Sequence, residues 1–231
     1  DRARSQKRLV PVRTGRTIAF AIFALAAGSA CAQNNRPFND LKIRAEAGDK
    51  TAARQIAEAY YLGKGVDRDF KLAAHWYEKL AKQGDVRAQT YLGLMYARGY
   101  GVEKNMPLAI KWLNLAAIQR DPGAQYSLST LYFIGEGVPQ NFPESARLRK
   151  EAASRGHVQA QADLGRMYSE GKGVEKDLHQ AYYWLAVAAE QGDDTAPVDL
   201  KRISADMTGE QVREADTQAR EWMAKAKKTW K

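Results

Sequence analysis

The chain has 231 residues, of which 45% are hydrophobic and 27% are charged, and its formal net charge at pH 7 is +9. Six basic residues and one acid lie within residues 1–32, so this stretch carries +5 and the rest of the chain only +4. A surface that binds nucleic-acid phosphates needs clustered basic charge, so this thin surplus argues against a nucleic-acid partner.

The N-terminal stretch has the layout of an export signal. Basic residues precede the apolar run TIAFAIFALAAGSACAQ, which ends in the small residues Ala30, Cys31 and Ala32. This pattern predicts a signal peptide over residues 1–32, cleaved before Gln33, and hence a periplasmic or secreted protein. Two alternatives place the protein on a membrane: the run stays uncleaved as an anchor, or Cys31 is lipidated, although bacterial lipoproteins usually have Leu where Gly28 stands. Cleavage after Ala32 leaves a mature chain without cysteine.

The remaining chain repeats with a period of 36 residues. Glycines recur at this spacing, and so do alanines, aliphatic residues and tyrosines. The columns include Gly63, Gly99, Gly135 and Gly171; Gly65, Gly101, Gly137 and Gly173; Ala52, Ala88, Ala124 and Ala160; Ile56, Leu92, Leu128 and Leu164; and Tyr60, Tyr96, Tyr132 and Tyr168. So strict a period indicates an array of similar structural units.

Each unit is predicted to fold as two helices. Small or apolar residues at 52, 56, 57 and 60, and again at 73, 76, 77, 80 and 81, follow the spacing of a helical face. Polar side chains suited to capping come before the first helix (Asp49, Asp85, Asp121, Asp193) and before the second (Asp69, Asn105, Asn141, Asp177). The second helix ends at Gly48, Gly84, Gly156 and Gly192, where a left-handed residue is expected. Arg120 interrupts that last column, so we expect strain or an altered cap there.

The Gly-Lys-Gly at residues 63–65 superficially suggests a phosphate-binding loop. A phosphate loop follows a strand and opens a helix. Here the motif closes one helix and starts a turn into the next, in all four units, so positive φ in a tight turn explains the glycines better. The sequence therefore predicts no nucleotide, no other cofactor and no metal.

The pattern AxxxLGxxYxxGxGVxxDxxxAxxWxxxAAxxG, nearly complete in residues 88–120 and 160–192, resembles the Sel1-like repeat, a relative of the tetratricopeptide repeat. The resemblance implies an all-α, right-handed superhelical solenoid of antiparallel helix pairs. We divide the chain into the signal peptide (1–32), a linker and half-repeat helix (33–48), four repeats (49–192), and a half repeat with a capping helix (193–231). The third unit departs most, with Ser129 in the column of Gly93 and Gly165, Ser145 in the alanine column, and Leu148 where the other units have Trp.

Catalysis needs convergent groups, and the sequence offers few. The three histidines, His75, His157 and His179, fall in different units, and no HExxH, CxxC or GxSxG motif occurs. Some cysteine-rich Sel1-like proteins are linked to penicillin binding or hydrolysis, so a cell-wall-directed enzyme or regulator is the alternative function. Those proteins depend on paired cysteines within repeats, which this chain lacks. We therefore expect no enzyme.

The first helices carry a second set of columns, which face away from the core and vary between units. In a superhelix of helix pairs they line the concave groove, and aromatic residues and arginine are common anchors of protein interfaces. The predicted partner-binding residues are Arg54, Tyr61, Leu94, Arg98, Tyr126, Phe133, Ile134 and Arg166. We expect a non-catalytic scaffold that binds a protein segment or an envelope component. The competing interpretation is that some of these side chains pack against the neighbouring unit.

Overall fold

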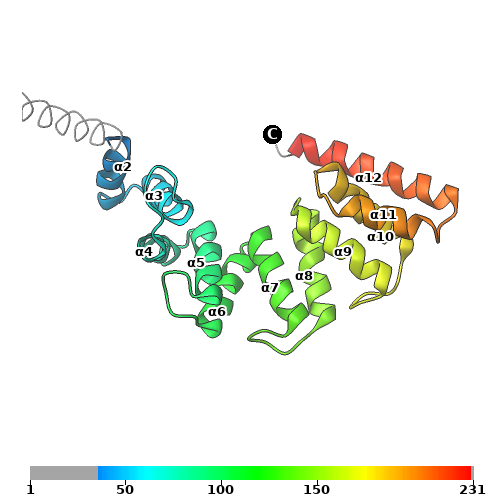
Figure 1. Cartoon of the computed structure of the whole chain (residues 1–231), viewed down its shortest axis with the longest axis horizontal. Coiled ribbons are helices and arrows are strands. Elements are labelled where there is room, and N and C mark those ends of the chain that lie inside the picture. The colour runs from blue at the N-terminus through cyan, green and yellow to red at the C-terminus, as the bar shows by residue number, and fades with distance from the viewer. Residues whose placement is uncertain (1–35, 230–231) are drawn as a thin grey trace, which may run out of the picture. The chain divides into compact units, whose positions relative to one another are not determined.

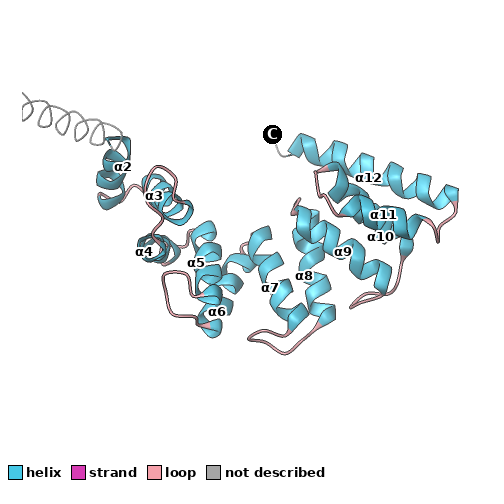
Figure 2. Cartoon of the chain, in the orientation of Figure 1, coloured by secondary structure: helices cyan, strands magenta, loops and turns pink. Residues whose placement is uncertain are grey.

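The computed structural model of the protein describes residues 36–229, so the predicted signal peptide lies outside the described residues. The described part forms eleven helices and no strand (Figure 2). These helices are α2 (Arg36–Glu46), α3 (Lys50–Leu62), α4 (Phe70–Ala81), α5 (Val86–Arg98), α6 (Met106–Ile118), α7 (Pro122–Ile134), α8 (Phe142–Ser154), α9 (Val158–Glu170), α10 (Leu178–Glu190), α11 (Ala196–Ser204) and α12 (Gly209–Thr229) (Figure 1). Within residues 36–229, none of them combines the length and the apolar character needed to cross a bilayer.

The chain divides into two compact units, residues 1–56 and 57–231, and the boundary falls within α3. In the second unit, each helix from α4 to α10 packs against the next one along the chain, and α10 contacts both α11 and α12. The first helices of neighbouring repeats also touch, α5 against α7 and α9 against α11. This order of packing confirms the predicted all-α solenoid of helix pairs with a repeat of about 36 residues.

The predicted helix caps are present. A side-chain acceptor bonds a free backbone N–H at the start of seven helices, from Asp69, Asp85, Asn105, Asp121, Asn141, His157 and Asp177. Asp49 and Asp193 do the same for α3 and α11. The predicted anomaly at Arg120 is real: it is the one non-glycine residue with positive φ (67°) among the described residues, at a position where the other units have glycine. Arg120 therefore carries the backbone strain that its column otherwise avoids.

Two glycines without positive φ explain how closely the helices of a repeat pack. A Cβ on Gly93 would lie 2.8 Å from Cγ of Leu113, and one on Gly165 would lie 2.7 Å from Cγ of Leu185. These separations are shorter than real carbon atoms allow. In the second and fourth repeats, a glycine on the first helix therefore makes room for a branched leucine on the second helix.

The third repeat solves the same packing problem with different residues. Ser129 occupies the glycine column, and the leucine position holds Arg149, which is only 5% exposed. Arginine is unbranched at Cγ, so it leaves space for the serine side chain. Ser145, in the alanine column, donates its hydroxyl to the carbonyl oxygen of Ser129 at 2.7 Å. The departures noted in the sequence are thus connected, and α7 packs along α8 despite them.

If Ser129 and Arg149 compensate each other, their substitutions will not be additive. Arg149→Leu alone places a branched Cγ against the serine and should destabilise the fold, whereas Ser129→Gly with Arg149→Leu restores the pattern of the neighbouring repeats. We expect the double variant to be more stable than the sum of the single variants by about 1–2 kcal/mol. Urea unfolding of the four proteins measures this coupling, and strictly additive free energies would contradict the pairing.

Candidate interaction surface

The predicted partner-binding residues at the N-terminal end differ in how freely they are presented. Tyr61, at the end of α3, is half-buried and packs edge-on against Phe70, Tyr77 and Tyr91, with ring centroids 5.5, 6.3 and 5.4 Å away. Arg54 lies in the other compact unit, on the same helix, and is half-buried. Tyr61 therefore belongs to an aromatic cluster that spans the first and second repeats rather than to a free surface.

The next first helix, α5, presents more accessible groups. Arg98 is exposed, with its guanidinium 5.8 Å from the centroid of the Tyr100 ring, and Leu94 is half-buried one turn earlier. On α7, Ile134 is 54% exposed. These three residues can contact a partner without any rearrangement of the fold.

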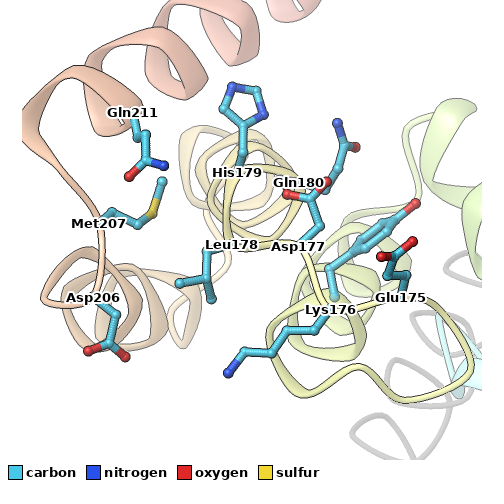
Figure 3. A pocket seen from close by; sticks show the side chains of 10 residues that line it. Glu175, Lys176, Asp177, Leu178, His179, Gln180, Asp206, Met207 and Gln211 are labelled. Carbon is cyan, nitrogen blue, oxygen red and sulfur yellow. Dashed lines mark hydrogen bonds between the residues drawn. The ribbon is translucent and has the colours of Figure 1, made fainter.

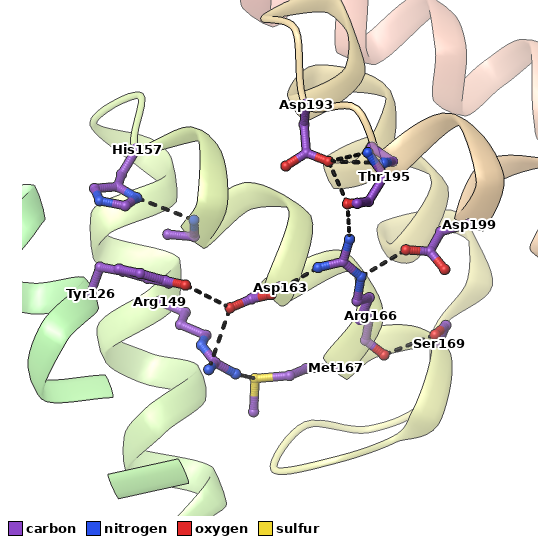
Figure 4. Close-up of polar contacts among 12 residues, drawn as sticks. Tyr126, Arg149, His157, Asp163, Arg166, Met167, Ser169, Asp193, Thr195 and Asp199 are labelled. Carbon is purple, nitrogen blue, oxygen red and sulfur yellow. Dashed lines mark hydrogen bonds and ion pairs between the residues drawn. The ribbon is translucent and has the colours of Figure 1, made fainter. Parts of the chain in front are cut away.

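Tyr126 and Arg166 lie in one polar network that joins α7, α8, α9 and α11 (Figure 4). Its centre is Asp163 on α9. The Tyr126 hydroxyl donates to Asp163 at 3.1 Å, and the guanidinium groups of Arg149 and Arg166 lie 3.5 and 2.9 Å from its carboxylate oxygens. Arg166 also pairs with Asp199 on α11 at 2.7 Å. The network therefore ties the third and fourth repeats to the half repeat that follows them through polar and charged side chains.

The network changes the proton affinities of Tyr126 and Arg166. Burial raises the pKa of the Tyr126 hydroxyl, and the neighbouring Asp163 carboxylate adds to this effect. Burial disfavours the charged form of Arg166, but its contacts with Asp199 and Asp163 outweigh that burial and raise its pKa. Both side chains thus keep their protons at any physiological pH, and their role in the network is a fixed one.

Phe133 lies beside two cations. The guanidinium carbon of Arg149 is 4.5 Å and the Lys172 Nζ is 4.4 Å from the centroid of its ring, and Phe142 packs edge-on at 5.3 Å. Lys172 also lies 4.6 Å from the Phe142 centroid, and among residues 36–229 no carboxylate pairs with it. The structure therefore places Phe133 between the repeats, beneath a lysine whose charge is not neutralised by an ion pair.

Tyr126, Phe133 and Arg98 are all among the residues that the sequence predicts to bind a partner. The structure connects the first two through Arg149, which contacts both Phe133 and Asp163. Arg98 instead lies over Tyr100. Arg149 itself was not singled out from the sequence, although its place in a column otherwise held by Tyr77, Leu113 and Leu185 is the signal that identifies it. Burial lowers its pKa, and its Nε has no hydrogen-bond partner.

A pocket of about 620 Å³ lies where the turn into α10 meets the turn between α11 and α12 (Figure 3). Its lining includes His179 and the carboxylates of Glu175, Asp177 and Asp206. Figure 3 shows the imidazole and the Asp206 carboxylate pointing in opposite directions, and Asp177 is used as a helix cap. The groups that would have to act together in acid–base catalysis do not converge. Over the described residues, no three His, Cys, Asp or Glu side chains are grouped to hold a metal ion.

A scan against protein-family models matches the Sel1 repeat to residues 51–85, 86–121, 122–157, 158–193 and 205–228. Among solved structures, the chain is similar to c5321, a protective antigen present in uropathogenic Escherichia coli strains, with 30% identity and a TM-score of 0.71 over 85% of this chain and 42% of that one. It is also similar to a Sel1 repeat protein from Oxalobacter formigenes, with 35% identity and a TM-score of 0.63 over 71% of this chain and 47% of that one.

A more distant likeness covers a larger part of both chains. The immunity protein Pa5087 from Pseudomonas aeruginosa has 22% identity and a TM-score of 0.51 over 94% of this chain and 84% of that one, which shows the fold alone. A search of the curated proteins found no match. The chain spans less than half the length of the E. coli and Oxalobacter proteins.

His157 gives the network a testable pH dependence. Its imidazole caps α9 by accepting the Ala160 N–H at Nδ1 (3.2 Å) and stacks on Tyr126 with centroids 4.5 Å apart. Burial lowers its pKa below the usual 6.5. Above that pH the ring is neutral in both folded and unfolded chains; as the pH falls below it, the unfolded chain takes up the proton first, so stability is lost.

His157→Asn keeps a capping side chain that does not titrate. We expect the variant to lose less stability than the wild type between pH 7.5 and pH 5.5, by about 1 kcal/mol or less. Denaturant unfolding at the two pH values measures the difference. Carboxylates contribute equally to both proteins, so identical pH slopes would show that His157 is not the responsible group.

Proposed function

Because the chain belongs to the Sel1 repeat family, we propose that it is a non-catalytic scaffold that binds a protein segment along the face of its first helices. Sel1 repeat proteins are generally protein-interaction scaffolds. This family background supports a protein partner but does not specify which one. The choice of face rests on the side chains of this particular chain.

The observation that carries the choice is the state of Lys172. Its ammonium group lies against the rings of Phe133 and Phe142 with no carboxylate partner among the described residues, close in sequence to the network residue Arg166. Ile134, next to Phe133, exposes more than half of its surface. An ammonium group without a carboxylate partner and an exposed apolar side chain on the same repeat array suit a segment that carries both a carboxylate and an apolar residue.

The contacts and exposure of the predicted residues support a division of roles between partner contact and positioning of the surface. Tyr61, Tyr126, Phe133 and Arg166 are half-buried and make contacts within or between repeats. Arg98 and Ile134 are exposed, and Leu94 is half-buried one turn before Arg98 on the same helix. We assign partner contact to the second group together with Lys172, and positioning to the first group.

The test uses accessible residues, so that folding and binding are separated. Arg98→Glu and Ile134→Glu should each weaken capture of the partner at least tenfold, about 1.4 kcal/mol, because they reverse a cation or place a charge in the apolar contact. The full chain, as bait in an extract of the cell envelope, identifies the partner, and titration of that partner with each variant gives the affinities.

The matched control is Lys111→Glu, a charge reversal at an exposed position of the second helix α6. It should leave both affinity and melting temperature unchanged. If both first-helix variants bind the partner as the wild type does, the face is wrongly assigned. If either lowers the melting temperature as a core substitution would, that residue belongs to the packing instead.

We also propose that the scaffold is exported, on the basis of the basic and apolar stretch in residues 1–32. N-terminal sequencing of the protein from the periplasmic fraction should begin at Gln33. A chain that begins at a lipid-modified Cys31 would place the protein on a membrane face, and a chain that retains Thr17 to Gly28 would overturn the proposal of a soluble exported protein.

A further inference from the structure

The third repeat contains a pocket of about 470 Å³ between α6, α7 and α8. Its apolar interior is lined by Ala117, Leu128, Tyr132 and Leu148, and the exposed Ile118 lies at its edge. None of the predicted partner-binding residues on the first helices lines it. A volume of this size lies within the range of about 300–1,000 Å³ that is usual for ligand sites.

The repeat period identifies what fills the same place elsewhere in the chain. A shift of 36 residues converts the four apolar lining residues into Ala153, Leu164, Tyr168 and Trp184. These four pack in one cluster, in which Trp184 is 6% exposed. Trp76 and Trp112 hold the same column in the first and second repeats. The pocket is therefore the position of an indole ring, left open because the third repeat has Leu148 instead of tryptophan.

A second departure leaves a buried hydrogen-bond acceptor at the same pocket. In the second and fourth repeats, a glutamine at the end of the second helix donates to a buried glutamine Oε1: Gln119 to Gln89 at 2.9 Å, and Gln191 to Gln161 at 2.6 Å. In the third repeat the donor position holds Arg155, whose Nη1 donates to the Glu151 carbonyl instead. Gln125, which is 1% exposed and lines the pocket, consequently has an Oε1 without a hydrogen-bond partner.

The rim of the pocket has unbalanced positive charge. Arg147 is paired with both Glu144 and Glu151, which leaves one negative charge in excess among these three, and Arg120 and Arg155 bring the sum over the five charged lining residues to +1. Arg120 and Arg155 also line the pocket, and neither has a carboxylate partner among residues 36–229. Ile118, at the edge, is 80% exposed. The pocket therefore combines an apolar interior, an unpartnered acceptor and a cationic rim.

We propose that this pocket receives a tryptophan side chain from an acidic segment of a partner protein. The indole ring fills the space that the chain's own tryptophans fill in the other repeats, and its N–H is the kind of donor that Gln125 Oε1 lacks. Acidic residues beside the tryptophan neutralise Arg120 and Arg155. This site is separate from the first-helix face and makes the scaffold able to hold two segments.

The test uses the full chain with the blocked peptide acetyl-Asp-Trp-Glu-amide, followed by NMR of labelled methyl groups. We expect saturable shifts at Ala117 and Leu128, and acetyl-Asp-Ala-Glu-amide should bind at least tenfold more weakly. Equal binding of the two peptides, or the absence of saturable shifts at these methyl groups, would overturn the proposal.

Leu148→Trp supplies the column's own residue and fills the pocket from inside. It should weaken binding of the tryptophan peptide at least tenfold without lowering the melting temperature. Lys201→Trp, which adds an indole at an exposed position on α11, is the control and should bind as the wild type does. Wild-type affinity in Leu148→Trp would also overturn the proposal.

Should Leu148→Trp fail to fold, Arg155→Gln keeps the proposal open to refutation. This variant restores the glutamine of the neighbouring repeats, which occupies Gln125 Oε1 and removes one rim cation, so affinity should fall at least threefold; unchanged affinity counts against the site. Arg98→Glu and Ile134→Glu should retain peptide binding here, which distinguishes a failure of this pocket from a failure of the first-helix face.

Discussion

The packing of each helix from α4 to α10 against the next one along the chain is the constraint on which the rest of this structure depends. A helix pair of this length cannot bury its apolar faces alone, so it must contact the pairs before and after it. That contact survives only if every turn returns the chain at the same angle. Capped helix starts and left-handed glycines at the turns fix this angle. Arg120 adopts the same left-handed conformation with a full side chain and is therefore strained.

A fixed repeat geometry makes each departure from the pattern meaningful, because the neighbouring repeats show what the position normally does. The third repeat departs at Ser129, Arg149, Leu148 and Arg155, and the consequences differ. The first two compensate each other within the core. No other change among the described residues offsets Leu148 and Arg155. They leave a pocket and an unpartnered buried acceptor. Compensated changes indicate packing, whereas uncompensated ones mark a candidate binding site.

The sequence was sufficient for the fold and insufficient for the surface, for a physical reason. Caps, turn glycines and core columns depend on local geometry and recur four times, so a period of 36 residues reveals them. The role of Tyr126 or Phe133 depends on residues in the next repeat: Asp163 binds the tyrosine hydroxyl and Lys172 covers the phenylalanine ring. Such contacts do not repeat along the chain, so the 36-residue period does not reveal them. Arg149 shows the same limit, since a buried arginine in a leucine column is predictable as an anomaly but not as a partner of Phe133.

The two proposed surfaces differ in what they ask of the scaffold. The first-helix face is braced by ion pairs that cross from α8 to α9 and on to α11, so its side chains are held before a partner arrives and less ordering entropy is lost on binding. The pocket of the third repeat is preorganised in another way. It lies at the position that a tryptophan side chain of the solenoid holds in each of the other three repeats. A partner that inserts a tryptophan there uses contacts already compatible with the packing of the fold, which requires no rearrangement of α6, α7 or α8.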